Sequence, residues 1–204
     1  MQPGKRTPDF VHDFVNCLQN SKWLPHIKHP LRARHTDTKK LCGANLFVFD
    51  VSVGSKKSVG HLEITPERED GLLHVFYIAS ELKGLGNEIL RRVVEYGRKN
   101  RFSKIDASST TYEKAASFWL YSGFRSEGVL YPNWDCMKAT HSTEVDLWQE
   151  RVQKDIYAYC ELAGTEIGRR VLSDVCFRPV LDFKNEKQCS YVAARLMLPR
   201  LRAT

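Results

Sequence analysis

The sequence lacks several features that mark particular classes of protein. Its 204 residues contain no apolar run long enough to cross a bilayer, which argues against a membrane-spanning segment. The first ten residues, MQPGKRTPDF, contain no apolar signal region, so we expect a cytoplasmic protein, or a nuclear one in a eukaryotic cell. Internal repeats and low-complexity segments are absent as well, which argues against a fibrous or disordered chain.

The six cysteines form no CxxC pair, and none has the Cys/His spacing of a zinc finger. No metal site is therefore predicted. A disulfide framework is not expected in an intracellular chain of this size. We expect the thiols to be free and reduced, in or near the core.

Positive charge, by contrast, is in excess. The formal net charge is +7 and the sequence pI is about 9.1, which favours an anionic partner such as a nucleic acid, an acidic protein or a phosphate-rich cofactor. The basic residues are spread along the chain. Those at 98–101 are expected to close a helix, whose dipole they complement.

Hydrophobic periodicity predicts an ordered series of helices and strands. Thr7-Pro8-Asp9 is typical of a helix start, while residues 23–40 predict an irregular loop. Strands are then predicted at 44–53 and 58–65, joined as a hairpin, and at 72–79, 104–108, 124–131 and 135–140. Further helices are predicted at 85–97, 113–121, 143–160, 167–175 and 189–198. A capping box of Thr143 and Asp146 is expected to open the helix at 143–160. The pattern predicts an α/β core with a mostly helical C-terminal extension.

A glycine turn joins the strand at 72–79 to the next helix. Gly84 and Gly86 carry no side chain, so backbone N–H groups can approach an anion closely, and the helix start adds unpaired donors and a positive dipole end. This combination suits a pyrophosphate. A tight turn that merely needs glycine is the alternative. A Rossmann dinucleotide turn is disfavoured because Asn87 does not supply the third glycine.

Two stretches carry a resemblance to a known family. In "ELKGLGNEILRRVVEYGRK", Glu81, Gly84 and Gly86 stand where a pyrophosphate-binding motif has Arg or Gln, then Gly, then Gly or Ala. In "YEKAASFWLYSGF", the matches to a later helix are Ala115, Trp119 and Gly123-Phe124, whereas Tyr112 stands where Asn is usual. Together with the order of elements, these stretches resemble the GNAT superfamily of acyl-CoA-dependent N-acyltransferases over roughly residues 40–140.

The resemblance implies a fold and an activity. The fold would be α/β, with a mixed, mostly antiparallel central sheet and flanking helices, as a GNAT-like domain at 1–140 and a helical extension at 141–204. The activity would be acetyl transfer from acetyl-CoA to an amine on a protein, a metabolite or an RNA-linked group, by direct attack. The residues implied in cofactor binding are Ile78, Glu81, Lys83, Gly84, Leu85, Gly86 and Asn87, with the Ile78 N–H on the thioester carbonyl.

Transfer to an amine requires a base and an acid. The resemblance puts bases on the central strands, where we rank Glu63 first, His74 second and His61 third. His61 and Glu63 share one strand face because side chains alternate along a strand. Many relatives carry a Tyr that acts as general acid at the position of Trp119, and Trp cannot donate a useful proton. Tyr121 is therefore the candidate general acid, with Tyr112 and Ser108 as further possible donors. For each of these residues, an ordinary structural role is the alternative.

Glu81 is the main departure from the family pattern. A carboxylate near a pyrophosphate is repelled by about 1 kcal/mol at 4 Å with water-like screening. Three explanations are open: Lys83 offsets this repulsion, Glu81 points to solvent so that only backbone donors matter, or the site does not bind CoA. In the last case the chain is a catalytically inactive binding or assembly module. It would dock, or form a homo-oligomer, through C-terminal helices with exposed Trp148, Tyr157 and Tyr159, for which packing onto the core is the alternative. An unrelated nucleic-acid-binding fold, suggested only by the bases at 28–40, is the third hypothesis.

Overall fold

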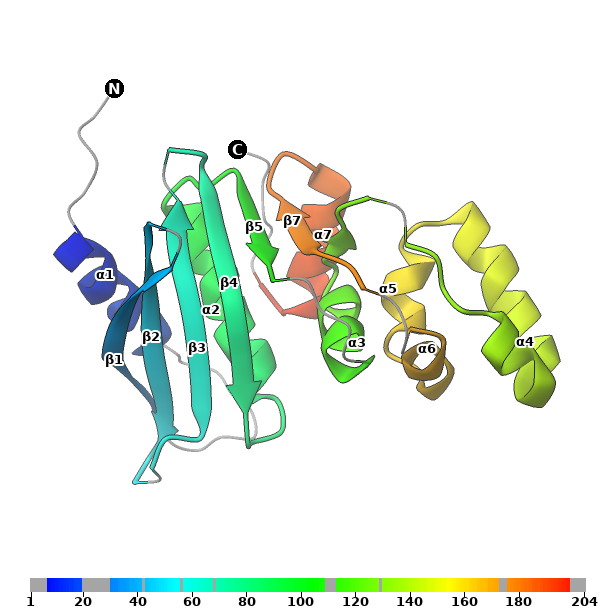
Figure 1. Cartoon of the computed structure of the whole chain (residues 1–204), viewed down its shortest axis with the longest axis horizontal. Coiled ribbons are helices and arrows are strands. Elements are labelled where there is room, and N and C mark those ends of the chain that lie inside the picture. The colour runs from blue at the N-terminus through cyan, green and yellow to red at the C-terminus, as the bar shows by residue number, and fades with distance from the viewer. Residues whose placement is uncertain are drawn as a thin grey trace. The chain divides into compact units, whose positions relative to one another are not determined.

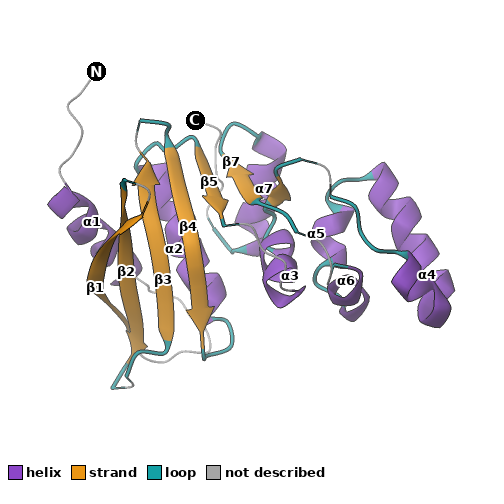
Figure 2. Cartoon of the chain, viewed as in Figure 1, coloured by secondary structure: helices purple, strands orange, loops and turns teal. Residues whose placement is uncertain are grey.

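The computed structural model describes residues 7–19, 30–41, 43–55, 57–67, 69–108, 113–128, 130–172 and 176–198. The chain divides into two compact units, residues 1–106 and 107–203. The elements of both units are labelled in Figure 1 and coloured by type in Figure 2. The domain boundary expected at residue 140 stays a prediction.

The first unit is an α/β unit built on a sheet in the order β1-β2-β3-β4-β5. Its elements are α1 (Thr7–Gln19), β1 (Leu31–Leu41), β2 (Ala44–Val53), β3 (Gly60–Glu67), β4 (Leu72–Ser80), α2 (Leu85–Lys99) and β5 (Lys104–Ala107). Strands β1 to β4 pair antiparallel. β5 runs parallel to β4, because Lys104 lies beside Gly71 at one end and Asp106 beside His74 further along. The mixed, mostly antiparallel sheet with flanking helices confirms the predicted fold class.

The predicted hairpin is confirmed, whereas the loop before it was predicted wrongly. Strands β2 and β3 pair with Phe49 opposite Leu62, as their apolar alternation requires. Residues 31–40 belong to β1 rather than to an irregular loop. Only Leu31 and Ala33 of this edge strand are buried, so its sequence, LRARHTDTKKL, carries little of the apolar alternation by which a strand is recognised. Residues 23–29 of the predicted loop lie outside the described part of the chain.

Helices α1 and α2 cover one face of this sheet, behind the strands in Figure 1. The rings of Phe10, Phe14, Phe49 and Tyr96 form the aromatic centre of this core, with centroids 4.9 to 6.5 Å apart. Gly60 marks the close approach of α2, since a Cβ there would lie 3.1 Å from a side-chain carbon of α2. No described helix of the first unit lies on the opposite side of the sheet, which we call the open face.

The second unit is mostly helical. Its elements are α3 (Glu113–Tyr121), β6 (Arg125–Ser126), α4 (Asp135–Lys154), α5 (Ala158–Leu162), α6 (Glu166–Val171), β7 (Pro179–Asp182) and α7 (Glu186–Arg195). β6 pairs antiparallel with β7. The strand predicted at 135–140 was wrong, because those residues open α4, and the partner of β6 comes from far along the sequence. The segment "PVLD" is too short to show an alternation, which is why β7 was missed.

Helix α4 is broken at His141, whose backbone is non-helical. The helical part after the break therefore starts at Ser142, and the predicted cap, Thr143, lies inside it. From this part, Val145 and Val152 enter a small apolar core with Leu162 and Val171. No helix in the described ranges combines the length and apolar character needed to span a membrane.

The aromatic residues expected to be exposed for docking are mostly buried within the second unit. Trp148 and Tyr159 pack against the apolar core, and the Tyr159 hydroxyl donates to the Leu130 carbonyl at 2.9 Å. Tyr157 is only 5% exposed. These rings thus pack within the second unit, and docking through the C-terminal helices stays a prediction.

Candidate active site

The glycine turn follows β4 directly and opens α2. The Glu81 N–H donates to the Val59 carbonyl at 2.9 Å and so continues the antiparallel pairing by one residue past β4. Gly84 then adopts a left-handed conformation, with φ of 83°, and caps α2. A Cβ at Gly84 would meet no atom within 4 Å, so open space lies in front of the turn. Glycine is required here by backbone conformation rather than by crowding.

Unpaired backbone donors lie at this helix start. The first helical bond runs from the Glu88 N–H to the Gly84 carbonyl at 3.1 Å. No described group accepts from the N–H groups of Gly86 and Asn87, which are the second and third of the helix. The Leu85 N–H donates to the Leu82 carbonyl at 3.1 Å, and the Leu85 side chain is fully buried. Of the predicted donors in the first turn, Gly86 and Asn87 are thus the ones without an acceptor among the described residues.

The two charged residues of the turn are both exposed. The Glu81 carboxylate makes no hydrogen bond or ion pair with any residue in the described ranges. Lys83 is likewise exposed, two residues away. Because Glu81 faces solvent, water screens its repulsion of an anion to about 1 kcal/mol per charge at 4 Å. The exposed Lys83 attracts the same anion with a similar energy and offsets this repulsion.

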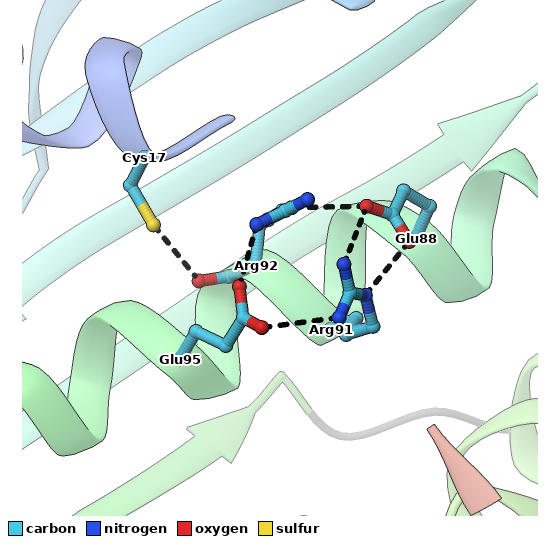
Figure 3. Close-up of polar contacts among 5 residues, drawn as sticks. All are labelled: Cys17, Glu88, Arg91, Arg92 and Glu95. Atoms are coloured by element: carbon cyan, nitrogen blue, oxygen red, sulfur yellow. Dashed lines mark hydrogen bonds and ion pairs between the residues drawn. The ribbon is translucent and has the colours of Figure 1, made fainter. Parts of the chain in front are cut away.

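The arginines of α2 are engaged within the helix (Figure 3). Glu88 accepts from Arg91 and from Arg92, each through Nε at 2.9 Å, and Glu95 accepts from both as well, at 3.1 and 2.7 Å. Burial opposes the charge of Arg91, but Glu88 and Glu95 outweigh it and raise its pKa. These four residues form a closed, neutral ring, which we call the α2 charge ring. Its guanidinium groups are therefore satisfied without any anionic ligand.

Cys17 of α1 lies against the α2 charge ring, with Sγ 3.5 Å from the Arg92 carbonyl (Figure 3). Burial and the Glu95 carboxylate raise the pKa of the thiol to about 11. The thiol therefore stays protonated at neutral pH, which makes it a poor nucleophile. Cys160 and Cys189 are buried as expected, whereas Cys136 and Cys176 are exposed and not in the core.

Polar side chains gather on the open face at β2 and β3. His61 lies opposite Asp50 in the register, and its Nδ1 is 3.3 Å from Asp50 Oδ1. Its Nε2 is 3.3 Å from Glu63 Oε1. Lys39 Nζ reaches the same Glu63 oxygen at 3.5 Å. Glu63, the first candidate base, is thus flanked by two potential cations on an accessible surface, with its side chain 22% exposed.

His74, the second candidate base, forms a separate pair. Its Nδ1 lies 2.6 Å from Asp106 Oδ1, and the two side chains are 12% and 4% exposed. With Nδ1 protonated, the ring donates to the carboxylate and Nε2 carries the lone pair, which is how a carboxylate fixes the tautomer of a basic histidine. The His74 ring also packs edge-on against Phe76, with centroids 4.2 Å apart.

Backbone alternation settles the direction of the Ile78 amide. The N–H of Glu81 points to β3, so Ala79 points to β3 as well, while Ile78 and Ser80 point to the opposite edge. The opposite edge of β4 is the side on which β5 lies in the sheet order. A β-bulge interrupts the β3–β4 register between Glu63 and Ile64, just before this stretch.

The remaining candidates belong to the second unit. The Tyr121 ring packs against Gly164, where an added Cβ would lie 2.5 Å from it, and Arg195 lies over the ring at 4.5 Å. Trp119 is buried against Phe124. Tyr112 lies outside the described residues, and Ser108 makes contacts within the chain. The acid role of Tyr121 stays a prediction.

Asp50 and Asp106 were missed by sequence reasoning. Each is flanked by apolar residues within its strand, in "FVFDV" and "KIDAS". A carboxylate within a buried strand is unusual unless it is paired, so this pattern could have pointed to a partner on the neighbouring strand. The identity of the partner depends on register, which the sequence does not give.

Two solved structures are similar to this chain at low identity. One is a proposed acetyltransferase of the GNAT family from Desulfovibrio desulfuricans, 16% identical, with a TM-score of 0.40 over 67% of this chain and 68% of that one. The other is an acetyltransferase from Bacillus subtilis in complex with CoA, 16% identical, with a TM-score of 0.39 over 88% of this chain and 95% of that one. No protein-family model matches the chain, and no curated protein matches it by sequence.

Proposed function

We propose that the chain is an acyl-CoA-dependent N-acyltransferase that passes acetyl from acetyl-CoA to an amine by direct attack. The observation that carries this proposal is the turn at Gly84, where the N–H groups of Gly86 and Asn87 are unpaired among the described residues and a Cβ on Gly84 would meet open space. Two backbone donors at the positive end of a 15-residue helix suit the pyrophosphate of CoA. Lys83 adds a cation at the same turn.

The rest of the cofactor would follow β4 from this turn. The Ile78 N–H, three residues before Glu81, points to the edge of β4 that faces β5 and would donate to the thioester carbonyl. Such a donor stabilises the negative charge that develops on the carbonyl oxygen during attack. The acceptor would approach over the open face, where the candidate bases lie.

Glu63 is the proposed general base, with His74 as the second candidate. Glu63 would take a proton from the ammonium group of the acceptor, so that the neutral amine attacks the thioester carbonyl, and the thiolate of CoA would leave and take a proton from water. Lys39 and His61 hold the Glu63 carboxylate in place. For His74, Asp106 performs the orienting role.

A second candidate function is a catalytically inactive binding module with this fold. The exposed carboxylate of Glu81 at the mouth of the turn favours it, since family members carry a cation or an amide there. The two proposals differ in one measurable property, the affinity for CoA. A cytoplasmic location and the identity of the acceptor stay predictions.

Calorimetric titration with CoA tests the proposal. Gly84→Asp places a carboxylate in front of the turn, in a left-handed conformation that Asp tolerates, and should weaken CoA binding at least tenfold. Gly43→Asp is the matched control, because Gly43 has a φ of 87° and equally open surroundings on the β1–β2 hairpin. CoA binding that is absent at millimolar concentration, or equal in the two variants, would contradict the proposal.

A further inference from the structure

A cavity of about 780 Å³ lies along the first half of β1, apart from the glycine turn. Its walls come from the end of α1, from β1 and β2, and from the loop before β3. The polar side chains that line it are those of Gln19, Arg32, Arg34, Asp50, Ser52, Lys57 and Ser58. Three of these seven are cations and one is an anion, so the cavity has a net positive charge.

The three cations have no partner in the described part of the chain. Arg32 and Arg34 lie two residues apart on one face of β1, opposite Ser52 and Asp50 in the register. Neither guanidinium group, nor the Lys57 ammonium, forms an ion pair or hydrogen bond with a described residue. This differs from the α2 charge ring, where every guanidinium is matched by a carboxylate. Three cations that line one cavity, against a single carboxylate, indicate a site for an anion.

The donor set suits a phosphate group better than a carboxylate. Two guanidinium groups and one ammonium supply more N–H donors than two carboxylate oxygens accept, whereas a phosphate offers three or four oxygens. The hydroxyls of Ser52 and Ser58 make only backbone bonds, at 3.4 and 3.1 Å, and can turn toward a ligand. Asp50 is the one group that repels an anion, and its Oδ1 lies 3.3 Å from His61 Nδ1.

Asp50 also connects the cavity to the candidate base. The polar contacts run from Asp50 to His61 and from His61 to Glu63, each at 3.3 Å and all on the open face. A ligand anchored in the cavity would therefore extend along the surface that carries Glu63. The glycine turn lies at the end of β4, and in the sheet order β3 separates β4 from β2, which forms a wall of the cavity. The cavity and the glycine turn are therefore separate places on the sheet.

We infer that this cavity binds a phosphate group of the amine acceptor, with Arg32, Arg34 and Lys57 as its ligands. The acceptor is then an amine that carries a phosphate, held so that its amine lies over Glu63. The assignment to the acceptor rests on the proposed function; the phosphate site itself does not.

The first test follows inorganic phosphate by NMR, through the side-chain Nε–H signals of Arg32 and Arg34. We expect saturable shifts of both signals, and Arg34→Gln should raise the dissociation constant about tenfold. Lys40→Gln is the matched control, because Lys40 is an exposed cation of the same strand that does not line the cavity, and it should change the constant less than twofold. Unmoved arginine signals, or equal effects of the two variants, would overturn the inference.

The second test asks whose phosphate the cavity holds. CoA and dephospho-CoA are titrated into the wild type and Arg34→Gln, and we expect no more than a twofold effect of the variant on either ligand. A variant that weakens CoA tenfold but spares dephospho-CoA would show that the cavity holds the 3′-phosphate of the cofactor, and would overturn the inference. Loss of all CoA binding with phosphate binding retained would instead refute the proposed function and leave the phosphate site in place.

Discussion

Removing Glu88 from the α2 charge ring should destabilise the first unit strongly. Its side chain is 4% exposed, and its two oxygens accept from Arg91 and Arg92 at 2.9 Å each. In Glu88→Ala, Glu95 must serve both guanidinium groups, of which Arg92 is 8% exposed. Breaking a buried ion pair by removing one partner costs about 3–5 kcal/mol, because a buried charge is left without compensation.

Two corrections to that cost are small. Alanine is the better helix former by a few tenths of a kcal/mol, and Glu95, at 28% exposed, retains both of its bonds. We therefore expect a loss of about 3 kcal/mol in the free energy of unfolding. The matched control is Glu166→Ala, which removes an i,i+4 partner of Arg170 whose side chain is 52% exposed and should cost less than about 0.5 kcal/mol.

Urea unfolding followed at the amide signals of β3 measures the first unit by itself, since two compact units need not unfold together. A double-mutant cycle of Glu88→Ala with Arg92→Ala should give a coupling energy above about 1 kcal/mol. If Glu88→Ala costs no more than Glu166→Ala, the reasoning from burial is refuted. In that case the α2 charge ring is an exposed network of little consequence.

The remaining predictions concern the proposed chemistry and the buried thiol. Glu63→Gln should lower kcat for acetyl transfer about 100-fold or more with CoA affinity unchanged, which single-turnover kinetics and calorimetry check; an unchanged kcat would remove Glu63 as the base. Asp106→Asn should leave CoA affinity intact and alter the pH dependence of kcat if His74 acts as a base, because the amide favours the wrong tautomer of the His74 ring. An unaltered pH profile of kcat would show that the His74–Asp106 pair is structural. Because the Cys17 pKa is raised to about 11, the folded state holds its proton where the unfolded thiol, with its pKa near 9, has lost it. The Cys17 contribution to stability is therefore present below pH 9 and is lost between pH 9 and 11, by up to about 3 kcal/mol, and Cys17→Ala should flatten the unfolding profile over that range.

Much of the first unit follows from local sequence patterns. The hairpin of β2 and β3 and the buried strand β4 follow from apolar alternation, and α2 follows from its apolar face and glycine start. Strands β1 and β7 do not. β1 is an exposed edge with two buried side chains, and β7 is four residues long and pairs with a strand more than 50 residues away. Such strands are stabilised by pairing with neighbouring strands, and a local sequence pattern carries no information about that pairing.

The candidate site was predictable in its backbone and not in its side-chain partners. The glycine turn was expected from Gly84 and Gly86, either for close approach to an anion or as a tight turn that needs glycine, and the φ of 83° at Gly84 shows that the turn does need glycine. The pairing of His74 with Asp106 joins residues 32 positions apart on parallel strands, and it depends on register. The same holds for the contact of His61 with Asp50. Whether these groups are catalytic depends on the ligand that the turn binds.

The central claim is that backbone donors at the start of α2 hold the pyrophosphate of CoA. The amide signals of Gly86 and Asn87 test it most directly during an NMR titration with CoA. The account predicts large downfield shifts of both amides at saturation, because each N–H gains a charge-assisted hydrogen bond, while the Gly43 amide stays in place. Saturable CoA binding that leaves Gly86 and Asn87 unmoved, or no binding at millimolar CoA, would contradict it.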